Sequence, residues 1–91
     1  MKKPQITIKY CTQCKWLLRA GWMAQELLQT FETDLEGVQL MPATGGTYEI
    51  LIDDQLIFSF KVSRRFPQPK EIKKLIRDHI DPDRDLGHND R

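Results

Sequence analysis

The chain lacks a strong net charge and any long apolar run. Its 91 residues include 14 basic and 13 acidic side chains, which leaves a net charge of +1. Proteins that bind nucleic acid or anionic membranes through charge usually carry a clear basic excess. No segment approaches the roughly 20 apolar residues of a membrane-spanning helix. We therefore expect neither a nucleic acid nor a membrane as a partner.

A secretory signal is also missing. Residues 1–4 are mostly polar and lead directly into an alternating segment, where a signal peptide would have its apolar core. We therefore expect a cytoplasmic protein. Cellular thiols keep structural disulfides reduced in that compartment, so the two cysteines of the chain are expected to serve catalysis or metal binding.

Zinc ligands are scarce. Structural zinc takes four ligands, and only His79 and His88 accompany the two cysteines, with no second cysteine pair. We expect no metal site and no bound cofactor.

What the chain does have is one Cys-x-x-Cys, formed by Cys11 and Cys14, between a segment of strand periodicity and one of helical periodicity. Two cysteines at this spacing can close a disulfide with little rearrangement of the chain. Unpaired N–H groups at the start of a helix stabilise a thiolate, which is the species that attacks disulfides. The pattern is typical of a thioredoxin-like redox site, and the helix geometry favours Cys11 as the nucleophile.

The periodicity of apolar residues predicts four strands and two helices. The expected strands cover residues 5–10, 38–41, 47–52 and 56–62, and the expected helices cover 14–31 and 70–80. Alternation places Ile6, Ile8 and Tyr10 on the core-facing side of the first strand. Because each strand alternates, one sheet face should be covered by both helices and the other should be open.

The predicted fold is therefore α/β (α+β): a thioredoxin-like two-layer sandwich of βαβββα order, with a four-stranded mixed sheet and two helices on one face. The first strand–helix–strand unit should be a parallel crossover. We expect this domain to span residues 1–80, and the almost wholly polar residues 81–91 to form a charged flexible tail.

This topology brings two more segments to the edge that carries the cysteines. The third strand, antiparallel to the first, begins where the first ends, so residues 44–47 should lie beside the cysteine pair. The fourth strand ends at the same edge and brings a basic loop there. The glycines at 45 and 46 would let the backbone of a substrate approach closely. The side chains of the basic loop either contact the substrate or have structural roles, with the two arginines in water and the phenylalanine anchored in the core. The expected substrate-binding residues are Gly45, Gly46, Arg64, Arg65 and Phe66.

Positive charge and exposed apolar side chains follow the second cysteine. Lys15 and Arg19 should favour an ionised thiol and, with the two loop arginines, are placed to hold the carboxylates of glutathione. The core-facing stripes are expected to include Leu17 and Leu28 on the first helix and Leu75 on the second. Leu18 and Trp22 lie four apart, off the stripe of the first helix. They either cover the rim of the sheet or contact a partner protein.

Three motifs together resemble the selenoprotein W/T/H (Rdx) family in its bacterial, all-cysteine form. They are Cys-Thr-Gln-Cys at 11–14, Thr-Gly-Gly-Thr-Tyr-Glu-Ile at 44–50 and Phe-Pro at 66–67. The resemblance implies a thioredoxin-like fold without its middle helix, and a thiol redox role linked to glutathione and antioxidant defence. Animal members place selenocysteine at the position of Cys14, which favours that sulfur as nucleophile, whereas the helix geometry favours Cys11.

We therefore expect a thiol–disulfide redox protein in which one cysteine attacks and the other resolves the mixed disulfide. Its partner would be glutathione, as co-substrate, or a protein that carries thiols or disulfides, and the chain itself would be a monomer or weak homodimer. The alternative is a non-catalytic, redox-sensitive adaptor that binds a partner through the surface around the cysteines.

Overall fold

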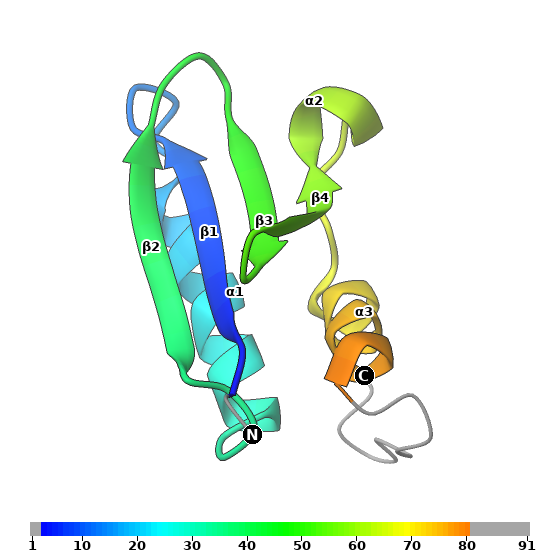
Figure 1. Ribbon diagram of the computed structural model, residues 1–91. Helices are drawn as coiled ribbons and strands as arrows, with labels where there is room; N and C mark the ends of the chain where they lie inside the picture. Colours follow the sequence, from blue (N-terminus) through cyan, green and yellow to red (C-terminus); the bar gives the residue numbers. More distant parts are fainter. Residues whose placement is uncertain (1–2, 81–91) are drawn as a thin grey trace.

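The first strand lies inside a four-stranded mixed sheet in the computed structural model, which describes residues 3–80 (Figure 1). The order across the sheet is β2-β1-β3-β4, with β1 parallel to β2 and antiparallel to β3. The parallel crossover is therefore confirmed, and the tail expected at residues 81–91 lies outside the described residues. In chain order the elements are β1 (Gln5–Cys11), α1 (Leu17–Thr30), β2 (Gly37–Ala43), β3 (Tyr48–Ile52), β4 (Gln55–Ser59), α2 (Phe60–Ser63) and α3 (Pro69–Ile80).

The buried apolar residues of β1 and β3 lie on one face of the sheet, as predicted, whereas Leu56 of β4 is 49% exposed. Ile6 and Ile8 of β1 face Ile52 and Ile50 of β3 across the antiparallel ladder, and all four side chains are fully buried. Burial of each such side chain contributes roughly 1.5–3 kcal/mol relative to exposure. Helices α1 and α3 supply the other half of this core, through Ala20, Met23, Ala24, Leu27, Ile72 and Ile76.

Both long helices cover the same face. Lys73 of α3 is nearly buried, and its Nζ lies 3.0 Å from Oε1 of Glu26 on α1. On the opposite face Thr7, Lys9 and Glu49 are only partly buried. The two-layer, thioredoxin-like sandwich predicted from the sequence is confirmed.

Two strand ends differ from the prediction by more than one residue. β2 does not stop before Pro42 but continues to Ala43, whose carbonyl accepts a hydrogen bond from Thr12 N–H at 3.0 Å. Successive residues of a parallel strand point their backbone groups to opposite sides. Since Ala43 bonds towards β1, the backbone of Pro42 points to the free edge of the sheet, where no hydrogen bond is lost through its missing N–H. β4 ends at Ser59 instead of residue 62, because Phe60 begins the short helix α2 and turns its ring towards Trp16.

Three leucines predicted to face the core do not. Leu17 and Leu28 of α1 are 49% and 40% exposed, and Leu75 of α3 is 39% exposed. The small sheet covers only a narrow stripe of each helix, so positions at the margin of a wide apolar stripe stay in contact with water.

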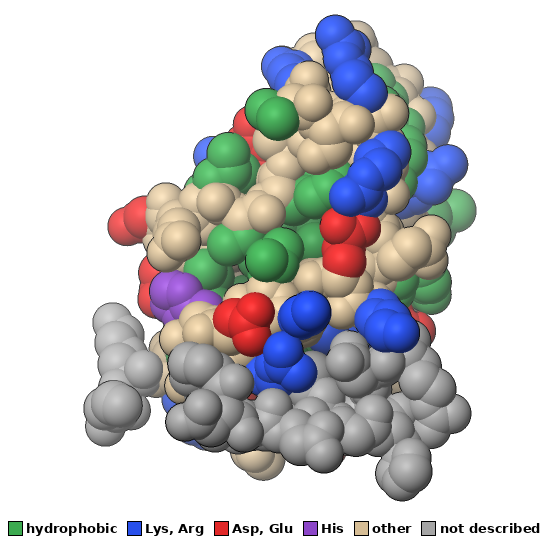
Figure 2. All heavy atoms as spheres, turned by 90° about the vertical axis from the view of Figure 1, so that its right-hand side faces the viewer, with side chains coloured by type: hydrophobic (Ala, Val, Ile, Leu, Met, Phe, Trp, Pro, Cys, Tyr) green, Lys and Arg blue, Asp and Glu red, His purple; other side chains and the backbone are tan. Residues whose placement is uncertain are grey.

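One end of the sheet gathers the segments that the sequence placed around the cysteines. The β1–α1 loop, the β2–β3 turn and α2 all lie at the upper end of the sheet in Figure 1. The side formed by β4, α2 and α3 faces the viewer in Figure 2, where basic and acidic side chains together border an apolar patch. Within residues 3–80, no helix has both the length and the apolar character needed to cross a membrane.

Candidate active site

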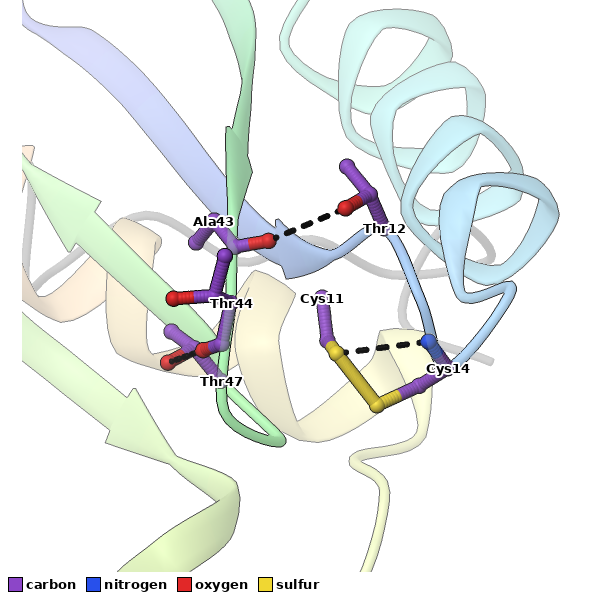
Figure 3. Close-up of a disulfide and its surroundings, with 6 residues drawn as sticks. All are labelled: Cys11, Thr12, Cys14, Ala43, Thr44 and Thr47. Carbon is purple, nitrogen blue, oxygen red and sulfur yellow. Dashed lines mark hydrogen bonds between the residues drawn. A yellow bond between two sulfur atoms is a disulfide. The ribbon is translucent and has the colours of Figure 1, made fainter.

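Cys11 and Cys14 form a disulfide at the end of β1, with their Cα atoms 5.3 Å apart (Figure 3). Their surroundings differ sharply. Cys11 is the last residue of the strand and only 1% exposed, whereas Cys14 lies in the following loop and is exposed. The backbone N–H of Cys14 points at Cys11 Sγ, 3.3 Å away. A reagent from solution therefore has access to the second cysteine, while the first is held inside the fold.

The loop between the cysteines and α1 corrects the predicted start of the helix. Helix α1 begins at Leu17 and not at Cys14, because Lys15 takes a positive φ of 62°. The Lys15 N–H bonds to the Thr12 carbonyl at 3.1 Å, and the Trp16 N–H bonds to the Cys11 carbonyl at 3.3 Å. Cys11 Sγ thus receives a hydrogen bond from within the loop and not from the first turn of the helix.

The turn at residues 44–47 lies beside the disulfide, as the topology predicted. Cys11 pairs with Ala43 in the parallel ladder, and the Ala43 carbonyl accepts hydrogen bonds from both the N–H and the hydroxyl of Thr12 (Figure 3). Gly45 and Gly46 then take φ values of +67° and +73°, which L-residues with side chains rarely adopt. These two glycines are required by the shape of the turn, and their contact with substrate stays a prediction.

An aromatic cluster anchors the far side of the loop. The Trp16 ring lies 4.8 Å from the Phe66 ring and 5.1 Å from the Phe60 ring, and 6.4 Å from Tyr48, measured between centroids. The guanidinium carbon of Arg19 lies 4.0 Å from the centre of the Phe66 ring. Phe66 therefore packs against the protein itself, which is the anchoring role that the sequence left open, and Arg19 is held over it.

Tyr48 closes the base of this cluster. Its hydroxyl donates a hydrogen bond to the Arg19 carbonyl at 3.4 Å, and its side chain is almost fully buried. Burial disfavours the charged phenolate and raises the pKa of Tyr48 to about 12, although the positive charge of Arg19 opposes this rise. The phenol stays neutral and structural at physiological pH.

The two loop arginines have different surroundings. Arg65 forms a bidentate ion pair with Glu71 of α3, at 2.6 and 2.8 Å, which raises the pKa of Arg65 and lowers that of Glu71. Arg64 is exposed, ends α2 in a left-handed conformation and forms no ion pair within residues 3–80. Of this pair, only Arg64 has a charge left open for a substrate.

A hollow next to the disulfide was not predicted. It has a volume of about 360 Å³ and is lined by Tyr10, Thr12, Lys15, Leu17 and Leu18. The signal in the sequence was the pair of adjacent leucines, Leu17 and Leu18, which begins three residues after Cys14, but helical periodicity assigned Leu17 to the core.

The described part of the chain gathers no group of three or more His, Cys, Asp or Glu side chains that could hold a metal ion. His79 lies on α3, and His88, the other possible zinc ligand, lies outside the described residues.

Comparison with known proteins finds one matching family and closely similar crystal structures. The model of the Rdx family matches residues 5–78. A crystal structure of a protein from Bordetella parapertussis is 50% identical, with a TM-score of 0.84, over 86% of this chain and 99% of that one. A crystal structure of a selenoprotein W-related protein from Vibrio cholerae is 46% identical, with a TM-score of 0.85, over 88% of this chain and all of that one. No curated protein matches.

Proposed function

The chain belongs to the Rdx family, and on this basis we propose that it is a thiol–disulfide oxidoreductase whose reacting groups are Cys11 and Cys14. The observation that carries the proposal is the unequal exposure of the two cysteines across one disulfide. In thiol–disulfide exchange by a cysteine pair, one sulfur reacts with the substrate and the second reacts only with the mixed disulfide that the first has formed. The candidate site has this arrangement.

Cys14 is the sulfur that exchanges with substrate. In the reduced protein its thiolate attacks one sulfur of a substrate disulfide, the substrate S–S bond breaks, and the leaving sulfur departs as a thiolate that takes up a proton. The Cys11 thiolate then attacks Cys14 Sγ, which forms the intramolecular disulfide and releases the second substrate thiol. Two electrons have passed from the protein to the substrate.

Cys11 is the resolving sulfur. Its burial protects it from reagents in solution, and the Cys14 N–H, 3.3 Å away, stabilises negative charge on it. The same hydrogen bond helps the reverse step, in which a thiol attacks Cys14 and Cys11 leaves as the thiolate. Lys15, directly after Cys14 in the chain, supplies a positive charge to the same loop.

Glutathione is the reductant we propose for this cycle. Two glutathione molecules reduce the Cys11–Cys14 disulfide through a mixed disulfide on Cys14 and leave as glutathione disulfide, so that atoms and electrons balance. A cytoplasmic location, where glutathione is kept reduced, suits such a cycle. An antioxidant role follows if the substrates are protein disulfides formed by oxidation.

Turnover of a chromogenic aromatic disulfide with glutathione as the reductant tests the proposal. The wild-type protein should accelerate release of the aromatic thiol. Cys14→Ser should abolish this acceleration, and Cys11→Ser should reduce it, because only glutathione then resolves the mixed disulfide on Cys14. Unchanged turnover in both variants would refute the assignment of the pair.

A redox-sensitive adaptor is the second candidate, favoured by the exposure of Leu18 (84%) and Trp22 (50%) on α1. In an adaptor, the disulfide only switches the binding of a partner protein. Trp22→Ala separates the two functions: it should remove partner binding from an adaptor, whereas an oxidoreductase keeps its turnover of a small disulfide.

A further inference from the structure

The hollow is lined in part by the loop that carries the two cysteines. Thr12 lies between the two cysteines and Lys15 directly follows the second, and both line the hollow together with Tyr10. Any molecule that fills this space therefore touches the loop that carries Cys14. The position suits a part of the substrate close to its reacting sulfur.

The remaining wall is apolar and open to water. Leu17 is 49% exposed and Leu18 is 84% exposed, although both lie on the helix that packs against the core. Trp22, 50% exposed, lies one helical turn beyond Leu18 and extends this apolar surface along α1. Adjacent exposed apolar side chains next to a reactive group are typical of a binding surface.

The charge of the hollow limits what it accepts. Lys15 is the only charged residue among the five that line it. Glutathione has two carboxylates and no large apolar side chain, so it matches this lining poorly. Two of the other cations expected to hold its carboxylates are engaged elsewhere, since Arg65 pairs with Glu71 and Arg19 lies over Phe66.

We propose that this hollow, named here the leucine pocket, binds a large apolar side chain next to the disulfide cysteine of a substrate protein. The bound segment is extended and carries neutral or acidic flanking residues, which Lys15 tolerates or attracts. The inference rests on the proposed function and names the substrate class of the same site. Protein disulfides are then the oxidants, while glutathione needs only access to Cys14.

Two short peptides test the leucine pocket. Each carries one cysteine as a mixed disulfide with the same chromogenic aromatic thiol, and they differ only in having leucine or serine before the cysteine. The Cys14 thiolate attacks the peptide sulfur, the aromatic thiolate leaves and is measured by its absorbance, and Cys11 then releases the peptide thiol. The reduced full-length chain is used, with glutathione to return the Cys11–Cys14 disulfide to two thiols after each cycle. For each peptide, kcat/KM is measured after subtraction of the direct reaction with glutathione.

The wild-type protein should react about tenfold faster with the leucine peptide, because burial of part of a leucine side chain is worth about one decade in rate. Leu18→Ser should remove most of this preference, so that the rates for the two peptides become nearly equal. Leu56→Ser is the matched control. Leu56 is as exposed as Leu17, at 49%, but it lies on β4 and lines a different hollow, so its substitution should leave both rates unchanged.

The outcomes separate the pocket from the chemistry. Equal kcat/KM for the two peptides with the wild-type protein overturns the leucine pocket and leaves the redox proposal standing. No release of the aromatic thiol from either peptide overturns the redox proposal and the pocket together. Sedimentation that shows a wild-type dimer and a monomeric Leu18→Ser variant also overturns the pocket, because a second copy of the chain would then cover the leucines.

Discussion

Trp16 should hold the redox loop to the rest of the fold, and its removal is the most informative change to the structure. It is partly buried, and its ring contacts Tyr48, Phe60 and Phe66 at centroid distances between 4.8 and 6.4 Å. Trp16→Ala removes all three contacts two residues after Cys14.

The expected loss can be worked out from these contacts. Each aromatic pair contributes about 0.5–1.5 kcal/mol beyond the burial of its surface, and three pairs together give about 3 kcal/mol. Replacement of a well-buried tryptophan by alanine costs about 3–5 kcal/mol. Because Trp16 is only partly buried, we expect the lower end of that range, about 3 kcal/mol, as the decrease in the free energy of unfolding.

Trp22→Ala is the matched control on the same helix. Trp22 is 50% exposed and has no ring contact within residues 3–80, so its loss should change stability by less than about 1 kcal/mol. Urea unfolding of the oxidised chains, followed by far-ultraviolet circular dichroism, measures both values. Equal destabilisation by the two substitutions would refute the anchoring role of Trp16, and Trp16→Phe should recover part of the loss.

Two further predictions concern single residues. Gly21→Ala should raise the free energy of unfolding by about 0.5–1 kcal/mol, because a Cβ on Gly21 meets no atom within 4 Å and alanine favours the helix; a lower urea midpoint would contradict this. Tyr48 should ionise near pH 12 in the Tyr10→Phe variant, where it is the only tyrosine, as measured by tyrosinate absorbance. Since burial raises this pKa above the ordinary 10, its contribution to stability is complete below pH 10 and is lost as the pH rises through about 12; ionisation near 10 would contradict the burial.

The alternating strands were predictable because their periodicity records directly which side chains face the helices. Ile6, Ile8 and Tyr10 were assigned to the core from alternation alone, and the structure buries all three. The position of residues 44–47 beside the cysteines followed from topology, since an antiparallel strand starts where its neighbour ends. Both the alternation and the position of this turn follow from the regular geometry of strands, which the order of apolar and polar residues specifies.

The details of the site depended on single backbone torsions and could not be predicted. Lys15 takes a left-handed conformation that delays α1 to Leu17, and lysine gives no signal for such a turn. This delay places Cys14 in an exposed loop and leaves Leu17 partly exposed in the wall of the hollow, not in the core. The ion pair between Arg65 and Glu71 likewise depends on how α3 follows the loop.

The rate of alkylation against pH, for each cysteine alone, tests the central claim most directly. The account predicts that Cys14, measured in Cys11→Ser, reacts faster at every pH than Cys11 in Cys14→Ser. Cys14 should also titrate below the ordinary thiol value of about 8.5, since the positive charge of the adjacent Lys15 favours the thiolate. Faster alkylation of Cys11, or titration of both thiols near 8.5, would contradict the assignment of Cys14 as the sulfur that meets the substrate.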